Sequence, residues 1–90
     1  MKPHKVDANQ AEIIRWLRKA GASVWVTTEY GRGAPDLVIG YRMRTFLLEV
    51  KSPKGRVTQI QWNWHHNWQG NPVIIVRSAE EALIAIGATQ

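Results

Sequence analysis

The sequence predicts an α/β fold in which a mixed sheet of about four strands is flanked by helices in the order α-β-β-β-α-β-α. Helical spacing of apolar residues in two segments, and a capping serine before a third, indicate the helices. Four short segments rich in β-branched or apolar residues, separated by glycine and proline, indicate the strands. Because 90 residues have room for one core, we expect a single domain over residues 1–90.

The first helix is expected from about residue 7 to residue 20, where apolar residues recur every three or four positions. Gly21 follows and supplies the stop. Either Asp7 or Asn9 would cap its start with a side-chain oxygen.

Strand composition predicts the sheet. The expected strands cover residues 23–28, 35–40, 45–51 and 73–76. A loop with two glycines separates the first two, and a basic hairpin connection joins the second and third. The third is almost continuously apolar until Glu49, as is typical of a strand covered on both faces.

A second helix is predicted between the last two strands. Thr58 lies near its start, and one helical stripe contains Val57, Ile60, Gln61, Trp64 and Trp68. A last helix is expected after Ser78, with Glu80 and Glu81 in the first turn, where the helix dipole favours negative charge.

Composition narrows the possible functions. The absence of cysteine excludes disulfides and thiolate metal sites, and His4, His65 and His66 lack zinc-like spacing. No apolar run is long enough to cross a membrane and no signal peptide is visible, so we expect a cytoplasmic protein with no membrane partner, compatible with a phage-encoded protein acting in a host cell. The formal net charge of +5 suits a phosphate-rich partner.

Tryptophan is unusually frequent. Three of the five tryptophans fall within residues 62–68, and so small a core has little room for all of them. At least one is therefore expected to meet another protomer or a nucleobase. Trp62 lies off the predicted buried stripe, which favours a homodimer.

Three charged residues stand at strand ends. Glu49 and Lys51 point to the same face because side chains alternate along a strand, and Asp36 begins the adjoining strand. Two carboxylates converging on one point suit a hard divalent cation, and a nearby amine suits phosphodiester hydrolysis. The alternative is a turn-capping Asp36 with a solvated salt bridge between Glu49 and Lys51.

The segments GAPDL (33–37) and LEVK (48–51) resemble the motif of the PD-(D/E)XK nuclease superfamily. The segment TQIQWNW (58–64) is similar to the Thr-x-x-Gln-x-x-Trp signature of its VRR-NUC branch, so nearly the whole chain takes part in the resemblance. The resemblance implies a Mg²⁺- or Mn²⁺-dependent endonuclease with a restriction-endonuclease-like core. It implies that Asp36, Glu49 and the carbonyl of Val50 bind the metal and that Lys51 is the catalytic lysine.

Two glutamines are further candidates. Gln61 lies on the inward stripe of the second helix, so its amide is expected either to bond to backbone or to contact Lys51, a water at the metal or a phosphate. Relatives in the superfamily often place a glutamate on the inward face of the first helix. Here that face carries Gln10, whereas Glu12 lies on a flank, so the carboxylate is either replaced by Gln10 or supplied by Glu12 through a local shift. The alternative is that both residues simply belong to the first turns of the helix.

The expected partner is DNA. Five basic residues are predicted in loops or at element ends around the carboxylates, where they would contact phosphates: Arg32, Arg42, Arg44, Lys54 and Arg56. By resemblance to small Holliday-junction resolvases, a dimeric enzyme would cut branched DNA in replication, recombination or repair. The alternatives are a flap, end or non-selective duplex nuclease, and a non-catalytic DNA-binding module with a vestigial site. His65 and His66 are expected to be structural or solvent-facing.

Overall fold

The computed structural model describes residues 9–88, and its element order agrees with the predicted α-β-β-β-α-β-α order. One short 3₁₀ helix, η1 (Thr28–Tyr30), was not expected. The other elements are α1 (Gln10–Lys19), β1 (Ser23–Val26), β2 (Leu37–Tyr41), β3 (Arg44–Val50), α2 (Gln59–Asn67), β4 (Ile74–Val76) and α3 (Ala79–Ile86). Within residues 9–88, no helix is both long and apolar enough to cross a membrane.

The four strands form one mixed sheet in the order β1-β2-β3-β4. Neighbours β1–β2 and β2–β3 are antiparallel, whereas β3 and β4 are parallel. In the central hairpin Leu37 pairs with Leu48, and Tyr41 pairs with Arg44 across a tight turn. Because this register continues without a bulge, the same-face partners on β2 and β3 are fixed along the whole hairpin.

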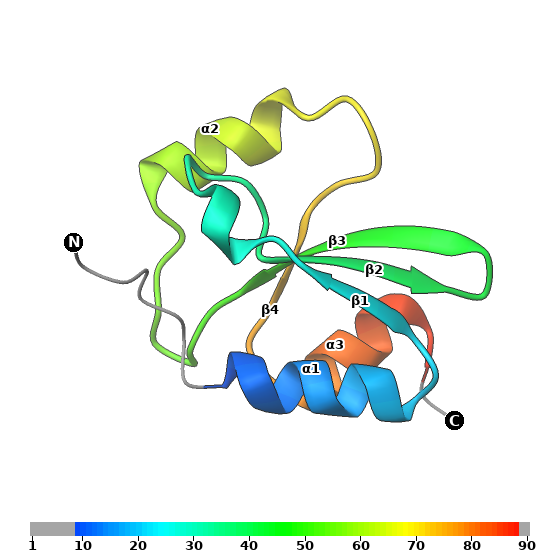
Figure 1. Cartoon of the computed structure of the whole chain (residues 1–90). Helices are drawn as coiled ribbons and strands as arrows, with labels where there is room; N and C mark the ends of the chain where they lie inside the picture. The colour runs from blue at the N-terminus through cyan, green and yellow to red at the C-terminus, as the bar shows by residue number, and fades with distance from the viewer. Residues whose placement is uncertain (1–8, 89–90) are drawn as a thin grey trace.

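The hydrophobic core lies between the sheet and the α1–α3 pair, which lie together on one side of the sheet (Figure 1). Helix α1 contributes Ile13 and Leu17, and both side chains are fully buried. The remaining core residues come from α3, the strands and the turn before β1: Ala22, Leu37, Ile39, Leu48, Val50, Val76, Ala82 and Ile86. Helices α1 and α3 therefore shield these residues on one face of the sheet from water.

Helix α2 lies on the opposite side of the sheet (Figure 1), and most of its residues are exposed. The predicted stripe was wrong for Ile60, whose side chain is 62% exposed. Contacts to the sheet side come instead from Gln61, Trp64 and His65. No further layer covers the outer side of α2 in the described part of the chain, so apolar residues there remain in contact with solvent.

The start of α1 differs from the expectation. Asn9 occupies the N-cap position, but its side chain makes no capping hydrogen bond, and Asp7 lies outside the described residues. The Asn9 amide instead donates to the backbone carbonyls of Lys51 (3.1 Å) and Arg77 (2.9 Å). Asn9 thus ties α1 to the ends of β3 and β4 rather than satisfying its own helix.

The other two helices begin as predicted. Thr58 accepts a hydrogen bond from the backbone N–H of Gln61, and the Gln61 side chain accepts one from the N–H of Thr58, which completes a capping box. Ser78 caps α3 by accepting from the N–H of Glu81, and Glu80 and Glu81 occupy the first turn. Both caps fix where the helices start relative to the sheet.

Candidate active site

Asp36 immediately precedes β2, at the end of the hairpin where β3 finishes. Its N–H donates to the carbonyl of Leu48 at 3.0 Å, although Leu48 is the register partner of Leu37, so the regular pairing ends at Leu37. The Asp36 carboxylate also accepts a hydrogen bond from the N–H of Val50 at 2.8 Å. Both bonds hold Asp36 at the end of β3, next to the segment that carries Glu49.

Glu49 is the most deeply buried charged residue within residues 9–88, with a side chain that is 1% exposed. The Lys51 ammonium lies 3.9 Å from its Oε2, and Gln61 donates to the same oxygen at 2.9 Å. Burying a carboxylate costs several kcal/mol, roughly, unless such partners compensate. The pair is thus largely removed from water, which does not fit the alternative of a solvated salt bridge.

Gln61 makes the backbone contact that its pattern allowed and, in addition, a contact to Glu49 that was not predicted. Its Oε1 accepts from the backbone N–H of Thr58 at 2.9 Å, while its Nε2 donates to Glu49. The capping box fixes the amide orientation, because the oxygen must face the backbone donor. The donor end is therefore held toward Glu49, and not toward Lys51 as one of the expectations had it.

On helix α1, the inward residue is Gln10 and the exposed one is Glu12. The Gln10 amide donates to the hydroxyl of Thr28 at 2.9 Å, and that hydroxyl lies 3.4 Å from the carbonyl of Asp36, to which it donates. Gln10 reaches the site through Thr28 and the backbone rather than through a carboxylate. No acid from α1 joins Asp36 and Glu49.

His65 is a residue of the site that the sequence analysis assigned to structure or solvent. Its Nε2 lies 3.6 Å from Oε1 of Glu49, and its side chain is only 7% exposed. Burial lowers the pKa of His65 below its ordinary value and the Lys51 charge lowers it further, whereas Asp36 raises it. The sequence feature that could have identified it is its spacing from Gln61: the two residues are four positions apart, so they lie on the same face of a helix.

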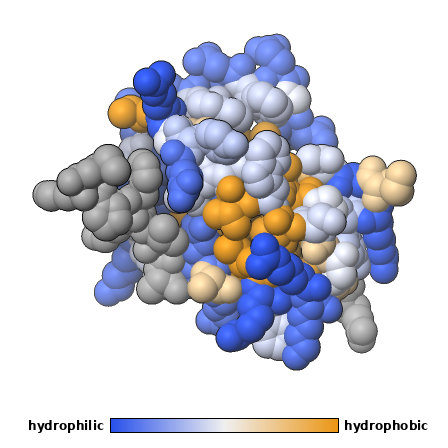
Figure 2. All heavy atoms as spheres, viewed as in Figure 1, coloured by the Kyte–Doolittle hydropathy of each residue, from blue (hydrophilic) through white to orange (hydrophobic). Residues whose placement is uncertain are grey.

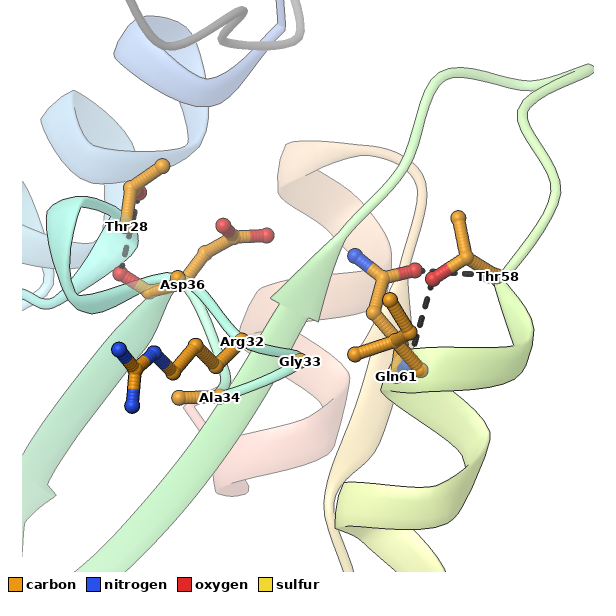
Figure 3. A pocket seen from close by; sticks show the side chains of 9 residues that line it. Thr28, Arg32, Gly33, Ala34, Asp36, Thr58 and Gln61 are labelled. Atoms are coloured by element: carbon orange, nitrogen blue, oxygen red, sulfur yellow. Dashed lines mark hydrogen bonds between the residues drawn. The ribbon is translucent and has the colours of Figure 1, made fainter.

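A cavity of about 260 Å³ opens beside Asp36, between the loop that precedes β2 and the start of α2. Figure 3 shows the Asp36 carboxylate and the Gln61 amide approaching this space from opposite sides. Gly33 has a positive φ of +88° and touches α2 so closely that a Cβ there would lie 2.5 Å from the carbonyl oxygen of Ile60. The contact holds the loop that carries Asp36 against the helix that carries Gln61.

The five predicted basic residues fall into two groups. In the first group, Arg32 lines the cavity beside Asp36, and Lys54 and Arg56 are exposed in the segment after β3. Arg77 holds this segment in place by donating to the backbone carbonyls of residues 52 and 55 at 2.7 Å.

Arg42 and Arg44 were wrongly placed around the carboxylates. They flank the turn at the other end of the β2–β3 hairpin, beside Tyr41, which is five positions from Asp36 and thus about 17 Å away at about 3.3 Å per residue. There each guanidinium packs on a neighbouring ring: Arg42 on Tyr41 and Arg44 on Phe46. The length of the hairpin separates them from the site.

The oxygens of Asp36 and Glu49 are hard donors of the kind that Mg²⁺ and Mn²⁺ prefer. Within residues 9–88, no three His, Cys, Asp or Glu side chains are grouped closely enough to hold a metal ion. Two carboxylates with a backbone carbonyl nevertheless fit Mg²⁺, because this ion keeps several of its waters. The Val50 backbone lies beside Asp36, as their hydrogen bond requires.

An apolar groove lies on the same side of the sheet as α2, lined by Trp25, Thr27, Tyr30, Ala34, Pro35, Val38, Leu47, Trp64 and Trp68. Trp25 is 58% and Tyr30 65% exposed, and none of the lining residues is charged. Trp62 is also exposed, but it does not line the groove. Figure 2 shows hydrophobic residues gathered in the middle of the visible face, surrounded by hydrophilic ones.

No family model, curated protein or solved structure matches this chain. The resemblance to VRR-NUC nucleases therefore rests on the motif residues alone.

Proposed function

We propose that this protein is a Mg²⁺- or Mn²⁺-dependent endonuclease that hydrolyses phosphodiester bonds in DNA. The observation that supports this most strongly is that Asp36, which lines an open cavity, is hydrogen-bonded to the end of β3 that carries the buried pair of Glu49 and Lys51. A buried acid and amine are costly for a fold and are typical of catalytic sites.

The residues would divide the work as follows. Asp36 and Glu49, with the carbonyl of Val50, hold the cation, which when bound supplies Lewis acidity and neutralises charge on the phosphate. Lys51 lies on the Glu49 side and orients the attacking water or offsets the charge that develops on the phosphate oxygens. Gln61 keeps the Glu49 carboxylate in place.

DNA is the substrate that the surrounding charge favours. The net charge is +5, and Arg32, Lys54 and Arg56 belong to the segments that flank the carboxylates. Their contacts would be to the phosphate backbone, which gives affinity and position without base specificity. A structure-selective nuclease needs no more than that from its basic residues.

Cleavage of three labelled DNAs tests this function: a four-way junction, a flap and a linear duplex. We expect cutting with Mg²⁺ or Mn²⁺, none with EDTA, and the fastest cutting on the junction. Fastest cutting of the flap or equal cutting of all three would favour the flap, end or non-selective nuclease instead. Binding of DNA without cleavage in either metal would favour the non-catalytic module and contradict the proposal.

The apolar groove supports a homodimer as the active form. An uncharged aromatic surface does not match the phosphates of DNA, but it does match a second copy of itself across a two-fold axis. Two sites related by such an axis would act on opposed strands, which is what resolution of a four-way junction requires. Trp62 is exposed as predicted and stays a candidate contact, to which the groove adds Trp25 and Tyr30.

Sedimentation velocity at micromolar concentration tests the dimer. We expect the wild type to sediment as a dimer and Trp25→Ser to weaken the dimer by at least about 30-fold, or about 2 kcal/mol, as for a buried aromatic contact. Trp16→Ser is the matched control, because Trp16 is exposed on α1 away from the groove. A monomeric wild type would contradict the dimer.

A further inference from the structure

Helix α2 presents two side chains to one carboxylate. Gln61 donates to Oε2 of Glu49 at 2.9 Å, and Nε2 of His65 lies 3.6 Å from Oε1. The two residues are four positions apart, so they leave the same face of the helix one turn apart. Each oxygen of Glu49 therefore faces its own residue from α2.

The position of the imidazole is not explained by a role in the core. His65 is more than nine-tenths buried, yet its Nε2 has no hydrogen-bond partner within residues 9–88. Buried polar atoms are nearly always hydrogen-bonded, so the unpaired Nε2 indicates a hydrogen bond that forms in another arrangement of the site. At 3.6 Å, Nε2 is too far from Glu49 for a hydrogen bond but close enough to form one after a small movement.

The ring has little freedom to turn away. It meets Trp62 edge-on, with ring centroids 5.8 Å apart, and Trp64 in the same manner at 6.5 Å. An imidazole with its hydrogen on Nε2 is a donor suited to a carboxylate oxygen.

We propose that His65 is a positioning residue that, together with Gln61, fixes the orientation of the Glu49 carboxylate for binding of the divalent cation. The inference rests on the proposed function, since it assigns His65 to the same site. Residues that hold a metal-binding side chain in place typically contribute about 10- to 100-fold to metal affinity. His65 should therefore affect how tightly the cation binds, without being needed once it is bound.

Calorimetric titration with Mn²⁺ in the absence of DNA measures this directly. We expect His65→Leu to weaken Mn²⁺ binding by about 10- to 100-fold and His65→Gln to restore most of it, because the glutamine amide places a donor near the position of Nε2. Cleavage by His65→Leu should return toward the wild-type rate at saturating Mn²⁺. His66→Leu is the matched control, since His66 is exposed on the same helix.

The outcomes separate the inference from the function on which it rests. Wild-type Mn²⁺ affinity in a folded His65→Leu variant would overturn the inference and leave the nuclease intact. Equal loss in His65→Leu and His65→Gln, with a lowered melting temperature in both, would also overturn it and assign the residue to packing. A wild type that neither binds Mn²⁺ nor cuts DNA would overturn both.

Discussion

Asp36→Asn should lower the cleavage rate on a four-way junction by roughly 10³-fold or more, and Lys51→Met should do the same. Each variant removes one charge from the site, and a loss of about 4 kcal/mol of transition-state stabilisation corresponds to a factor of about 10³. Asparagine keeps an oxygen that can accept from the N–H of Val50, and methionine keeps the aliphatic stem of the lysine. The backbone around the site should therefore remain in place.

The comparison needs controls for fold and for charge. Thermal unfolding followed by circular dichroism should place Asp36→Asn within a few degrees of the wild type and Lys51→Met lower, because Lys51→Met leaves the Glu49 carboxylate buried without its ammonium. Cleavage is therefore measured at a temperature at which circular dichroism shows both variants to be folded. Lys54→Met removes an exposed lysine near the same strand end, and it should reduce DNA binding modestly while leaving the cleavage rate at saturating DNA unchanged. Cutting of the junction at the wild-type rate by Asp36→Asn or Lys51→Met would disprove the assigned mechanism.

Gly33→Ala should destabilise the protein and slow cleavage together. The added Cβ would lie 2.5 Å from the Ile60 carbonyl oxygen, and the positive φ of +88° disfavours any L side chain. We expect a loss of about 3 kcal/mol, from about 1 kcal/mol of backbone strain and about 2 kcal/mol of overpacking. Relief of the clash must move the loop away from α2, which also separates Asp36 from Gln61.

Gly21→Ala isolates the contribution of the contact. Gly21 also has a positive φ, +95°, but a Cβ there would meet nothing within 4 Å. This variant should lose only about 1 kcal/mol in urea unfolding, and its cleavage rate should not change. If the two alanine variants were equally stable and equally active, the contact between Gly33 and Ile60 would not hold the site together.

Local patterns were sufficient for most of the fold. The apolar strand ending at Glu49 and the capping residues Thr58 and Ser78 predicted β3, α2 and α3 nearly at their observed bounds. The prediction of which α2 residues face the sheet was partly wrong, because helical periodicity shows which residues share a face but not how the helix is rotated about its axis against the sheet. The observed inward face includes His65 and excludes Ile60.

For the site, the sequence by itself placed Glu49 and Lys51 on one face of β3, because side chains alternate along a strand, and placed Asp36 at the adjoining end of β2. Helical spacing also put Gln10, rather than Glu12, on the inward face of α1. The tertiary structure alone decided that Gln10 bonds to Thr28 and that His65 reaches Glu49 from α2. Such contacts depend on how each helix is rotated and docked against the sheet, which is set by packing over the whole domain and not by neighbouring residues.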